Sequence, residues 1–205
     1  MANAPSVKRE AVLSEARKLF YERGIRAVGV DSISASSGVA KMTLYSHFGS
    51  KDELIAACLE SVDDKYLKWL EGKVVDQSSD PGEQLLAIFD ALEGWFENPR
   101  FRGCAFVNAA IELPDLEHPG RAAIHNHKTR MREWISELAK AAGAAEPDQI
   151  GAQILLLMEG AIISAAVERD PQSAHNAKVI AGHLLVASGI LSTASPILAS
   201  APPAD

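Results

Sequence analysis

Residues 38–54, GVAKMTLYSHFGSKDEL, restrict the possible folds of this chain more than any other stretch. Residues 31–36 and 41–47 each suit a short helix, and Gly38 between them tolerates the left-handed conformation that a sharp turn requires. Two short helices joined at roughly a right angle through such a turn form a helix-turn-helix. The second helix of that motif is narrow enough to enter the major groove of DNA, so the sequence predicts a DNA-reading element.

The second predicted helix has an apolar side and a polar side. Leu44 and Phe48 are spaced i and i+4 and are expected to face the core. The other side chains are expected to face outward, where hydrogen-bond donors suit phosphates and base edges. The predicted DNA contacts are Lys41, Met42, Thr43, Tyr45, His47 and Lys51. In the alternative interpretation the residues of this helix only pack a small three-helix subdomain. That interpretation fits Leu44 and Phe48 better than it fits the polar residues.

A third helix is predicted to begin directly after this motif and to run to about Gly72. Ser50, Lys51, Asp52 and Glu53 form the pattern of a capping box, in which Ser50 and Glu53 bond to free amides at the helix start. Free amides and the helix dipole both favour an anion at such a terminus, and Lys51 adds a full positive charge. This helix start is therefore a predicted phosphate site.

The sequence LYSHFGSKDEL, preceded by VDSISASSGVA, resembles the DNA-binding domain of the TetR family of one-component bacterial regulators. The resemblance implies that Lys41 and Thr43 lie near bases and that Tyr45, His47 and Lys51 lie on phosphates. The segment RGCAFVNAA, residues 102–110, also resembles a subset of the ligand domains of this family. The resemblance therefore extends beyond the DNA-reading element.

Four positions depart from the residues that are usual in the family, which are alanine, alanine, serine and a small residue. They are Ser34, Ser37, Ala40 and Met42. Ala40 is expected to cap the reading helix weakly because it has no side-chain acceptor. Met42 is expected to affect which operator sequence is bound.

Charge is divided unevenly along the chain, whose total is −7. Residues 1–50 hold seven Lys and Arg against four Asp and Glu, a net charge of +3. Residues 51–205 hold 13 against 23, a net charge of −10. A basic head on an acidic body can hold the head toward DNA and the body away from it. A structural DNA-binding protein of the nucleoid type, by contrast, is expected to be basic throughout.

Apolar residues recur at helical spacing through the rest of the chain, and no stretch alternates as a strand does. We predict an all-α fold of about nine helices. The predicted domains are a helix-turn-helix DNA-binding domain at residues 1–50, a ligand-binding and dimerisation domain at 51–195 and a disordered tail at 196–205. Helices are expected to start at Pro81 after an Asp80 cap, near residue 101, and at Pro147, with the last at residues 174–192.

The resemblance implies three partners, which are double-stranded operator DNA, a small-molecule effector and a second copy of the chain. Aromatic and lone polar side chains of the body suit either an effector pocket or simple core packing. The predicted pocket residues are Trp69, Trp95, Phe106, Asn108, Glu112, His127, Met131 and Trp134. The predicted dimer interface consists of Ile154, Leu157, Ala161, Ala165, Leu184 and Ala187. The expected protein is a repressor that binds a palindromic operator as a homodimer and is released by a small apolar molecule.

A helical enzyme is the main alternative class. The chain has no G-x-S-x-G motif, phosphate loop or paired carboxylates on one helical face, so no catalytic residue is predicted. His118, His125 and His127 with neighbouring carboxylates suggest a metal by residue type alone. His125 and His127 lie about 200° apart on a helix, however, and cannot share a face. We predict neither a metal nor a cofactor.

The sequence favours a cytoplasmic protein without a membrane span. Cys58 and Cys104 are not in CxxC spacing, as expected in a reducing compartment, although Cys104 is also considered as a redox sensor. The first residues lack the apolar segment of a signal peptide. The last helix is uncharged from residue 179 onward, which suits a membrane span, but Gly182, His183 and Gly189 interrupt it.

Overall fold

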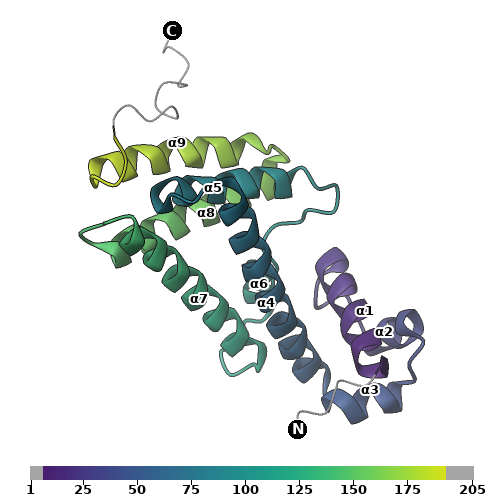
Figure 1. Ribbon diagram of the computed structural model, residues 1–205. Coiled ribbons are helices and arrows are strands. Elements are labelled where there is room, and N and C mark those ends of the chain that lie inside the picture. The colour runs from purple at the N-terminus through teal and green to yellow at the C-terminus, as the bar shows by residue number, and fades with distance from the viewer. Residues whose placement is uncertain (1–6, 193–205) are drawn as a thin grey trace. The chain divides into compact units, whose positions relative to one another are not determined.

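The computed structural model describes residues 7–192, which contain nine α-helices and no strand (Figure 1). This confirms the predicted all-α fold with its amino-terminal helix-turn-helix. The predicted tail at residues 196–205 lies outside the described residues. The chain forms two compact units, and helices α4 (Lys51–Gln77) and α7 (Gly120–Ala141) each contribute residues to both.

Unit 1 comprises the residues up to Lys65 together with Cys104–His127. Its complete helices are α1 (Val7–Arg23), α2 (Val30–Ser37), α3 (Lys41–Phe48) and α6 (Ala105–Glu112). Helices α1, α2 and α3 pack against one another around side chains that are buried because they repeat on one face of each helix. Val12, Ala16, Ile33, Leu44 and Leu54 are each 0% exposed in this core.

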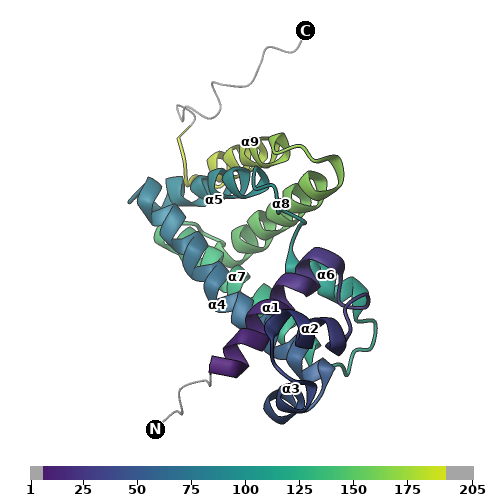
Figure 2. The same cartoon turned by 90° about the vertical axis from the view of Figure 1, so that its right-hand side faces the viewer.

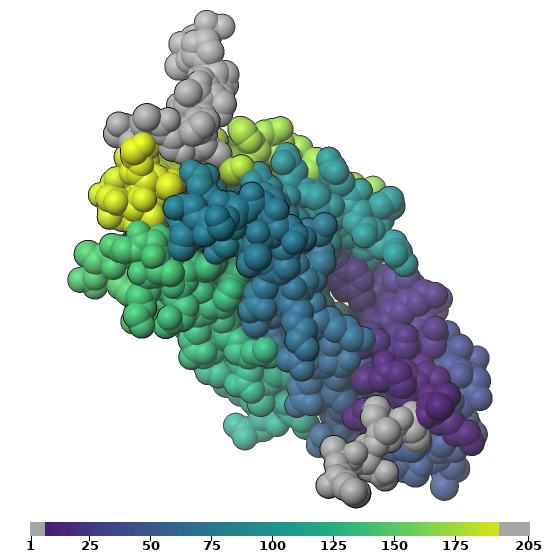
Figure 3. Space-filling model, in the orientation of Figure 1, coloured from purple at the N-terminus to yellow at the C-terminus, as the bar shows by residue number. Residues whose placement is uncertain are grey.

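Unit 2 comprises Tyr66–Gly103 together with the residues from Lys128 onward. Helices α5 (Pro81–Phe96), α8 (Pro147–Glu168) and α9 (Gln172–Ala187) lie side by side in it (Figures 1 and 2). Lys178 of α9 donates to the Asp90 carboxylate of α5 at 2.6 Å. A Cβ atom at Gly82 would lie 3.1 Å from Leu191, so the segment after α9 packs on the start of α5 (Figure 3).

The compact units divide the chain at a different place from the predicted domain boundary at residue 50. The start of α4, all of α6 and the start of α7 belong to the unit that holds the helix-turn-helix. Compactness and function are different criteria, so the functional division into residues 1–50 and 51–195 stays a prediction.

Several predicted helix ends were accurate and others were wrong. The Asp80 side chain accepts from the Glu83 amide at 2.9 Å and Pro81 opens α5, as predicted. Gly72 does not end α4, which runs to Gln77, because one exposed glycine costs only about 1 kcal/mol and buried Leu70 and Val74 flank it. Helix α6 starts at Ala105 rather than residue 101, since Gly103 has a φ of 84°.

The last helix, α9, also ends earlier than predicted. Its last residue is Ala187, and the Ser188 hydroxyl donates to the Leu184 carbonyl at 2.9 Å. Among the described residues, α8 is the helix that is long and apolar enough to cross a membrane. Such a helix also fits the core of a compact domain, and α8 packs here against α5 and α9.

Candidate nucleic-acid interface

The corner between α2 and α3 has the predicted glycine turn, with Gly38 at a φ of 68°. Two serines that depart from the family pattern stabilise it. The Ser34 hydroxyl donates to the Val39 carbonyl at 2.7 Å, and the Ser37 hydroxyl accepts from the Val39 amide at 3.3 Å. Alanine at these positions could make neither bond, so the serines stabilise the corner of the motif in this chain.

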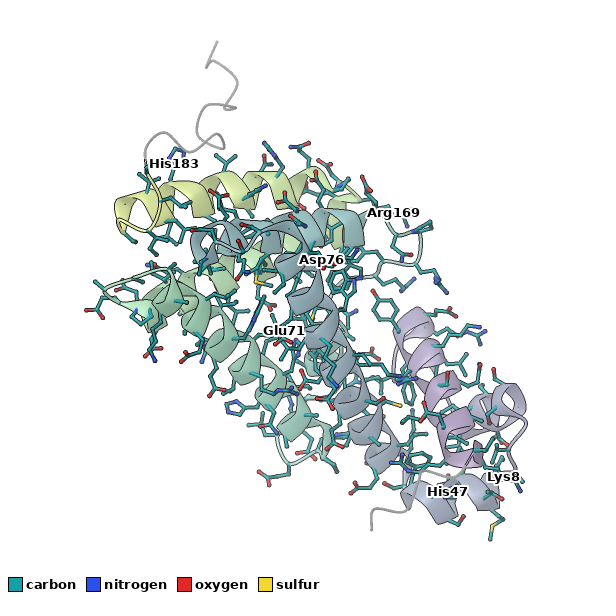
Figure 4. The ribbon with its side chains drawn as sticks, in the orientation of Figure 1. Lys8, His47, Glu71, Asp76, Arg169 and His183 are labelled. Atoms are coloured by element: carbon teal, nitrogen blue, oxygen red, sulfur yellow. The ribbon has the colours of Figure 1, made fainter. Side chains whose placement is uncertain are left out.

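Helix α3 buries one side and exposes the other. Leu44 is 0% and Phe48 7% exposed, as predicted, and the Arg9 guanidinium lies 5.0 Å from the centre of the Phe48 ring. On the other side Met42 is 82% and Tyr45 42% exposed. Lys41 is exposed, whereas Thr43 and His47 are half-buried. His47 is labelled in Figure 4. The five predicted DNA contacts on α3 therefore differ in how freely they can reach a partner.

Lys41 has a partner that the sequence analysis missed. Its ammonium forms an ion pair with the carboxylate of Asp31, in the first turn of α2, and both side chains are exposed. The pair links the two helices of the motif and partly neutralises Lys41. The signal available in the sequence was an acidic residue in the first helix of the motif and a basic residue at the start of the second.

Replacement of Asp31 by asparagine is expected to strengthen binding to duplex DNA of any sequence about two- to fivefold, because it releases Lys41 and removes a negative charge. The measurement is fluorescence anisotropy with a random duplex at low salt. Asp76→Asn is the matched control, since Asp76 is an exposed aspartate near the end of α4 (Figure 4). Equal affinities of the two variants would contradict this role of Asp31.

The amino-terminal ends of α3 and α4 are capped differently. Ala40 makes no side-chain cap at α3, as expected. At α4 the Ser50 hydroxyl accepts from the Glu53 amide at 3.0 Å, which confirms one half of the predicted capping box. The reciprocal half was wrong, because the Ser50 amide donates to the Phe48 carbonyl at 2.9 Å instead.

The Lys51 ammonium is anchored at the same helix start. It donates to the Ile25 carbonyl at 2.8 Å and lies 5.9 Å from the centre of the Phe20 ring. An ammonium has three N–H donors, and one is used here. Lys51 therefore has a fixed position beside the α4 amides, which is the arrangement that favours a phosphate.

Glu112 was predicted as an effector contact, but the structure gives it a different role. Its carboxylate accepts from the Arg26 amide at 2.8 Å, and its backbone carbonyl accepts from Arg26 Nε at 2.9 Å. A Cβ atom at Gly24, whose φ is 88°, would lie 3.2 Å from the same carboxylate. Glu112 therefore fastens the end of α6 to the turn after α1, and its Oε2 atom accepts from protein.

His127, another predicted effector contact, lies in a buried polar cluster of unit 1. Its Nδ1 atom lies 2.7 Å from Asp63 Oδ1, and its ring stacks on Phe106 with 3.7 Å between centroids. His127 is 2% and Asp63 6% exposed. Asn108, on the same helix as Phe106, is half-buried. Within the described residues no three His, Cys, Asp or Glu side chains form a group that could hold a metal ion.

The remaining predicted pocket residues lie in unit 2. Trp69 and Trp95 are 6.3 Å apart between ring centroids, and each lies 5.6 Å from Tyr66. Phe101 lies 4.9 Å from Trp95. Met131 is buried and Trp134 is half-buried. The structure thus brings Trp69 and Trp95 together in an aromatic cluster, and it divides the predicted pocket set between two units.

Half of the predicted dimer contacts are buried within the protomer. Ile154 is 0%, Ala161 4% and Ala165 3% exposed, so they offer no surface to a second copy. Leu157 and Leu184 are half-buried and Ala187 is exposed. Other residues of the two helices are exposed and uncharged, and those named here the α8–α9 face are Ala152, Leu156, Gly160, Ile163, Val167, Ile180, His183 and Ala187. His183 of this set is labelled in Figure 4.

Both cysteines are buried in unit 1. Cys58 donates weakly to the Leu13 carbonyl at 3.9 Å, and burial raises the pKa of its thiol to about 12. A thiol with such a pKa holds almost no thiolate at neutral pH, so Cys58 is chemically inert. Cys104, considered above as a redox sensor, is 7% exposed at the start of α6.

Unit 1 holds two helices joined by a glycine turn, and the long helix α4 continues from it into the helical unit 2. This organisation is typical of helix-turn-helix regulators. The pattern described as "Bacterial regulatory proteins, tetR family" matches residues 12–58. The pattern described as "Tetracyclin repressor-like, C-terminal domain" matches residues 81–180. Together these matches include the whole motif and most of unit 2.

Individual regulators are also similar to this chain in sequence or in structure. The repressor KstR2 of Mycobacterium tuberculosis (strain H37Rv) is 33% identical over 67% of this chain and 68% of its own length. The regulator YjdC of Escherichia coli is 24% identical over 87% of this chain and 94% of its own. The crystal structure of SCO4454, a TetR-family regulator from Streptomyces coelicolor, has a TM-score of 0.80 at 30% identity and covers 88% of this chain and 95% of its own. The chain belongs to the TetR family of transcriptional regulators.

Proposed function

We propose that this protein is a cytoplasmic transcriptional repressor, not an enzyme, that binds a palindromic operator as a homodimer and is released by a small apolar effector. The observation that carries the proposal is α3, which buries Leu44 and Phe48 and exposes Lys41, Met42 and Tyr45. A helix of this kind can enter the major groove while its apolar side stays in the core of the head. The repressor KstR2 supports the direction of regulation.

The α8–α9 face supports the homodimer. Leu156 is 71%, Val167 76% and Ile180 55% exposed, and the face carries no Asp, Glu, Lys or Arg. Exposed large apolar side chains at helical spacing mark a protein interface more often than a solvated surface. Two-fold pairing through it gives two reading helices, which a palindromic operator with half-sites about 34–36 Å apart, or a multiple of that spacing, accommodates.

Helix α4 supplies the proposed route from effector to DNA. It begins with Lys51 beside the reading helix in unit 1 and carries Trp69 in the aromatic cluster of unit 2. An effector that contacts Trp69, Trp95 or Trp134 and shifts α4 changes how Lys51 meets a phosphate. Release requires only a coupling free energy of about 1–3 kcal/mol, or about 5–150-fold in operator affinity.

The first experiment selects duplexes bound by the protein from a random pool and then measures affinity against salt. Enrichment of a palindrome is expected, with log affinity falling by about 0.9 per phosphate contact for each unit of log salt. Lys51→Ala is expected to weaken binding to all sequences and to flatten the slope by about 0.9. Lys73→Ala, which removes an exposed lysine from the same helix, is the control. A pool without enrichment would exclude the proposed function.

The effector is tested by linkage. Thermal-shift screening of apolar metabolites identifies a ligand, which is then titrated with and without the selected operator. Operator DNA is expected to weaken ligand binding by the same 5–150-fold factor, since the coupling is reciprocal. Equal ligand affinity in both titrations would rule out release by that ligand.

A further inference from the structure

Met42 is the most exposed large apolar side chain on the reading helix. It is 82% exposed, compared with 42% for Tyr45, the other exposed apolar residue of α3. At about 100° per residue, Met42 points about 200° away from buried Leu44, which is nearly opposite the core. Met42 therefore makes no substantial packing contribution to its own unit and points away from the core into solvent.

The side chains beside Met42 suit a surface that faces a groove of DNA. Lys41 precedes it, paired with Asp31, and Tyr45 lies one turn further along the same side. Both neighbours can donate hydrogen bonds to phosphates or base edges. Met42 has no donor, and its thioether sulfur is only a weak acceptor. Its side chain can gain binding energy chiefly by contact with an apolar group.

In the major groove of DNA that apolar group is the C5-methyl group of thymine, since the other base edges present hydrogen-bond donors and acceptors. We propose that Met42 contacts a thymine methyl group, so that each operator half-site favours thymine at the base pair facing the amino end of α3. This inference rests on the proposed function and adds the chemistry of one specific base contact. The flexible methionine side chain suits such a contact because it adapts to the position of the methyl group.

The test replaces each thymine of the selected operator in turn by uracil, which lacks only the methyl group. At one position per half-site the replacement is expected to weaken binding about fourfold, which corresponds to ~0.8 kcal/mol for one buried apolar carbon. The same replacement is expected to leave the affinity of Met42→Ala unchanged. Met42→Leu, which keeps an apolar side chain of similar size, is expected to retain most of the discrimination. Alanine and leucine both favour helix, so neither variant disturbs α3.

Three results would overturn the inference. The first is equal affinity for thymine and uracil at every position, and the second is an equal uracil penalty in the unmutated protein and Met42→Ala. The third is a Met42→Ala protein whose dimerisation, and not its base preference, is changed, since Met42 would then contact another copy of the chain. In each case specific binding to the selected operator still stands, whereas a pool without any enriched duplex overturns the proposed function itself.

Discussion

Replacement of Leu156 by glutamate is expected to convert the proposed dimer into a folded monomer. Leu156 belongs to the α8–α9 face and is 71% exposed in the protomer, so the fold itself tolerates a charge there. In a two-fold dimer the change occurs twice, and each carboxylate loses its water without gaining a partner. We expect the dimer dissociation constant to rise at least about 100-fold, which corresponds to about 2.7 kcal/mol. Sedimentation velocity at micromolar concentration measures the change.

Val75→Glu is the matched control for this experiment. Val75 is 64% exposed on α4 in the same unit but lies outside the α8–α9 face, so its replacement is expected to leave the dimer intact. Operator affinity is expected to fall with Leu156→Glu and to stay unchanged with Val75→Glu, because only a dimer binds both half-sites. An unmutated protein that sediments as a compact monomer, or a Leu156→Glu protein that stays dimeric, contradicts the proposed interface.

Replacement of His127 by leucine is expected to reduce the free energy of unfolding by about 3 kcal/mol. The change removes the nitrogen that lies 2.7 Å from Asp63 and leaves a buried carboxylate without this partner. For a chain of this size the midpoint of thermal unfolding should fall by roughly 6–12 °C. Circular dichroism during heating measures it.

The histidine two positions earlier provides the control for His127. His125 is exposed on the same helix, so His125→Leu is expected to change the midpoint little. The double variant Asp63→Leu with His127→Leu should recover part of the stability, because it removes both buried polar groups together. If His127→Leu unfolds at the same temperature as His125→Leu, the buried pair does not stabilise the fold.

The helix-turn-helix was predictable because its signals are local. Gly38 provides a left-handed residue, Ser50 accepts from the Glu53 amide, and Leu44 lies four residues from Phe48, and each of these features depends on near neighbours in the sequence. The departures of Ser34 and Ser37 from the family pattern were visible too. Their bonds to Val39 could be identified only from the structure, since alternative hydroxyl partners are close in any turn.

The outward face of α8 could not be predicted because that helix is apolar on several sides. Ile154 and Leu156 differ little in hydrophobicity, yet one is 0% and the other 71% exposed. Periodicity identifies a stripe only where polar residues mark the opposite side. The contact of Glu112 was missed for a different reason, since its partner Arg26 lies 86 residues away in the sequence. A polar side chain in an apolar segment indicates a partner without showing which one it is.

Unit 1 is assembled from two separated parts of the chain, and this affects how the protein is made. Phe106, Glu112 and His127 complete a unit whose other part ends at Lys65. A nascent chain therefore exposes α1, α2 and α3 outside the ribosome before α6 has been synthesised. Amino-terminal segments begin to fold during translation, but Arg26 and Asp63 must wait for partners that emerge later. A truncated polypeptide that stops at residue 65 lacks these partners, so premature termination is expected to produce a less stable head that proteases remove.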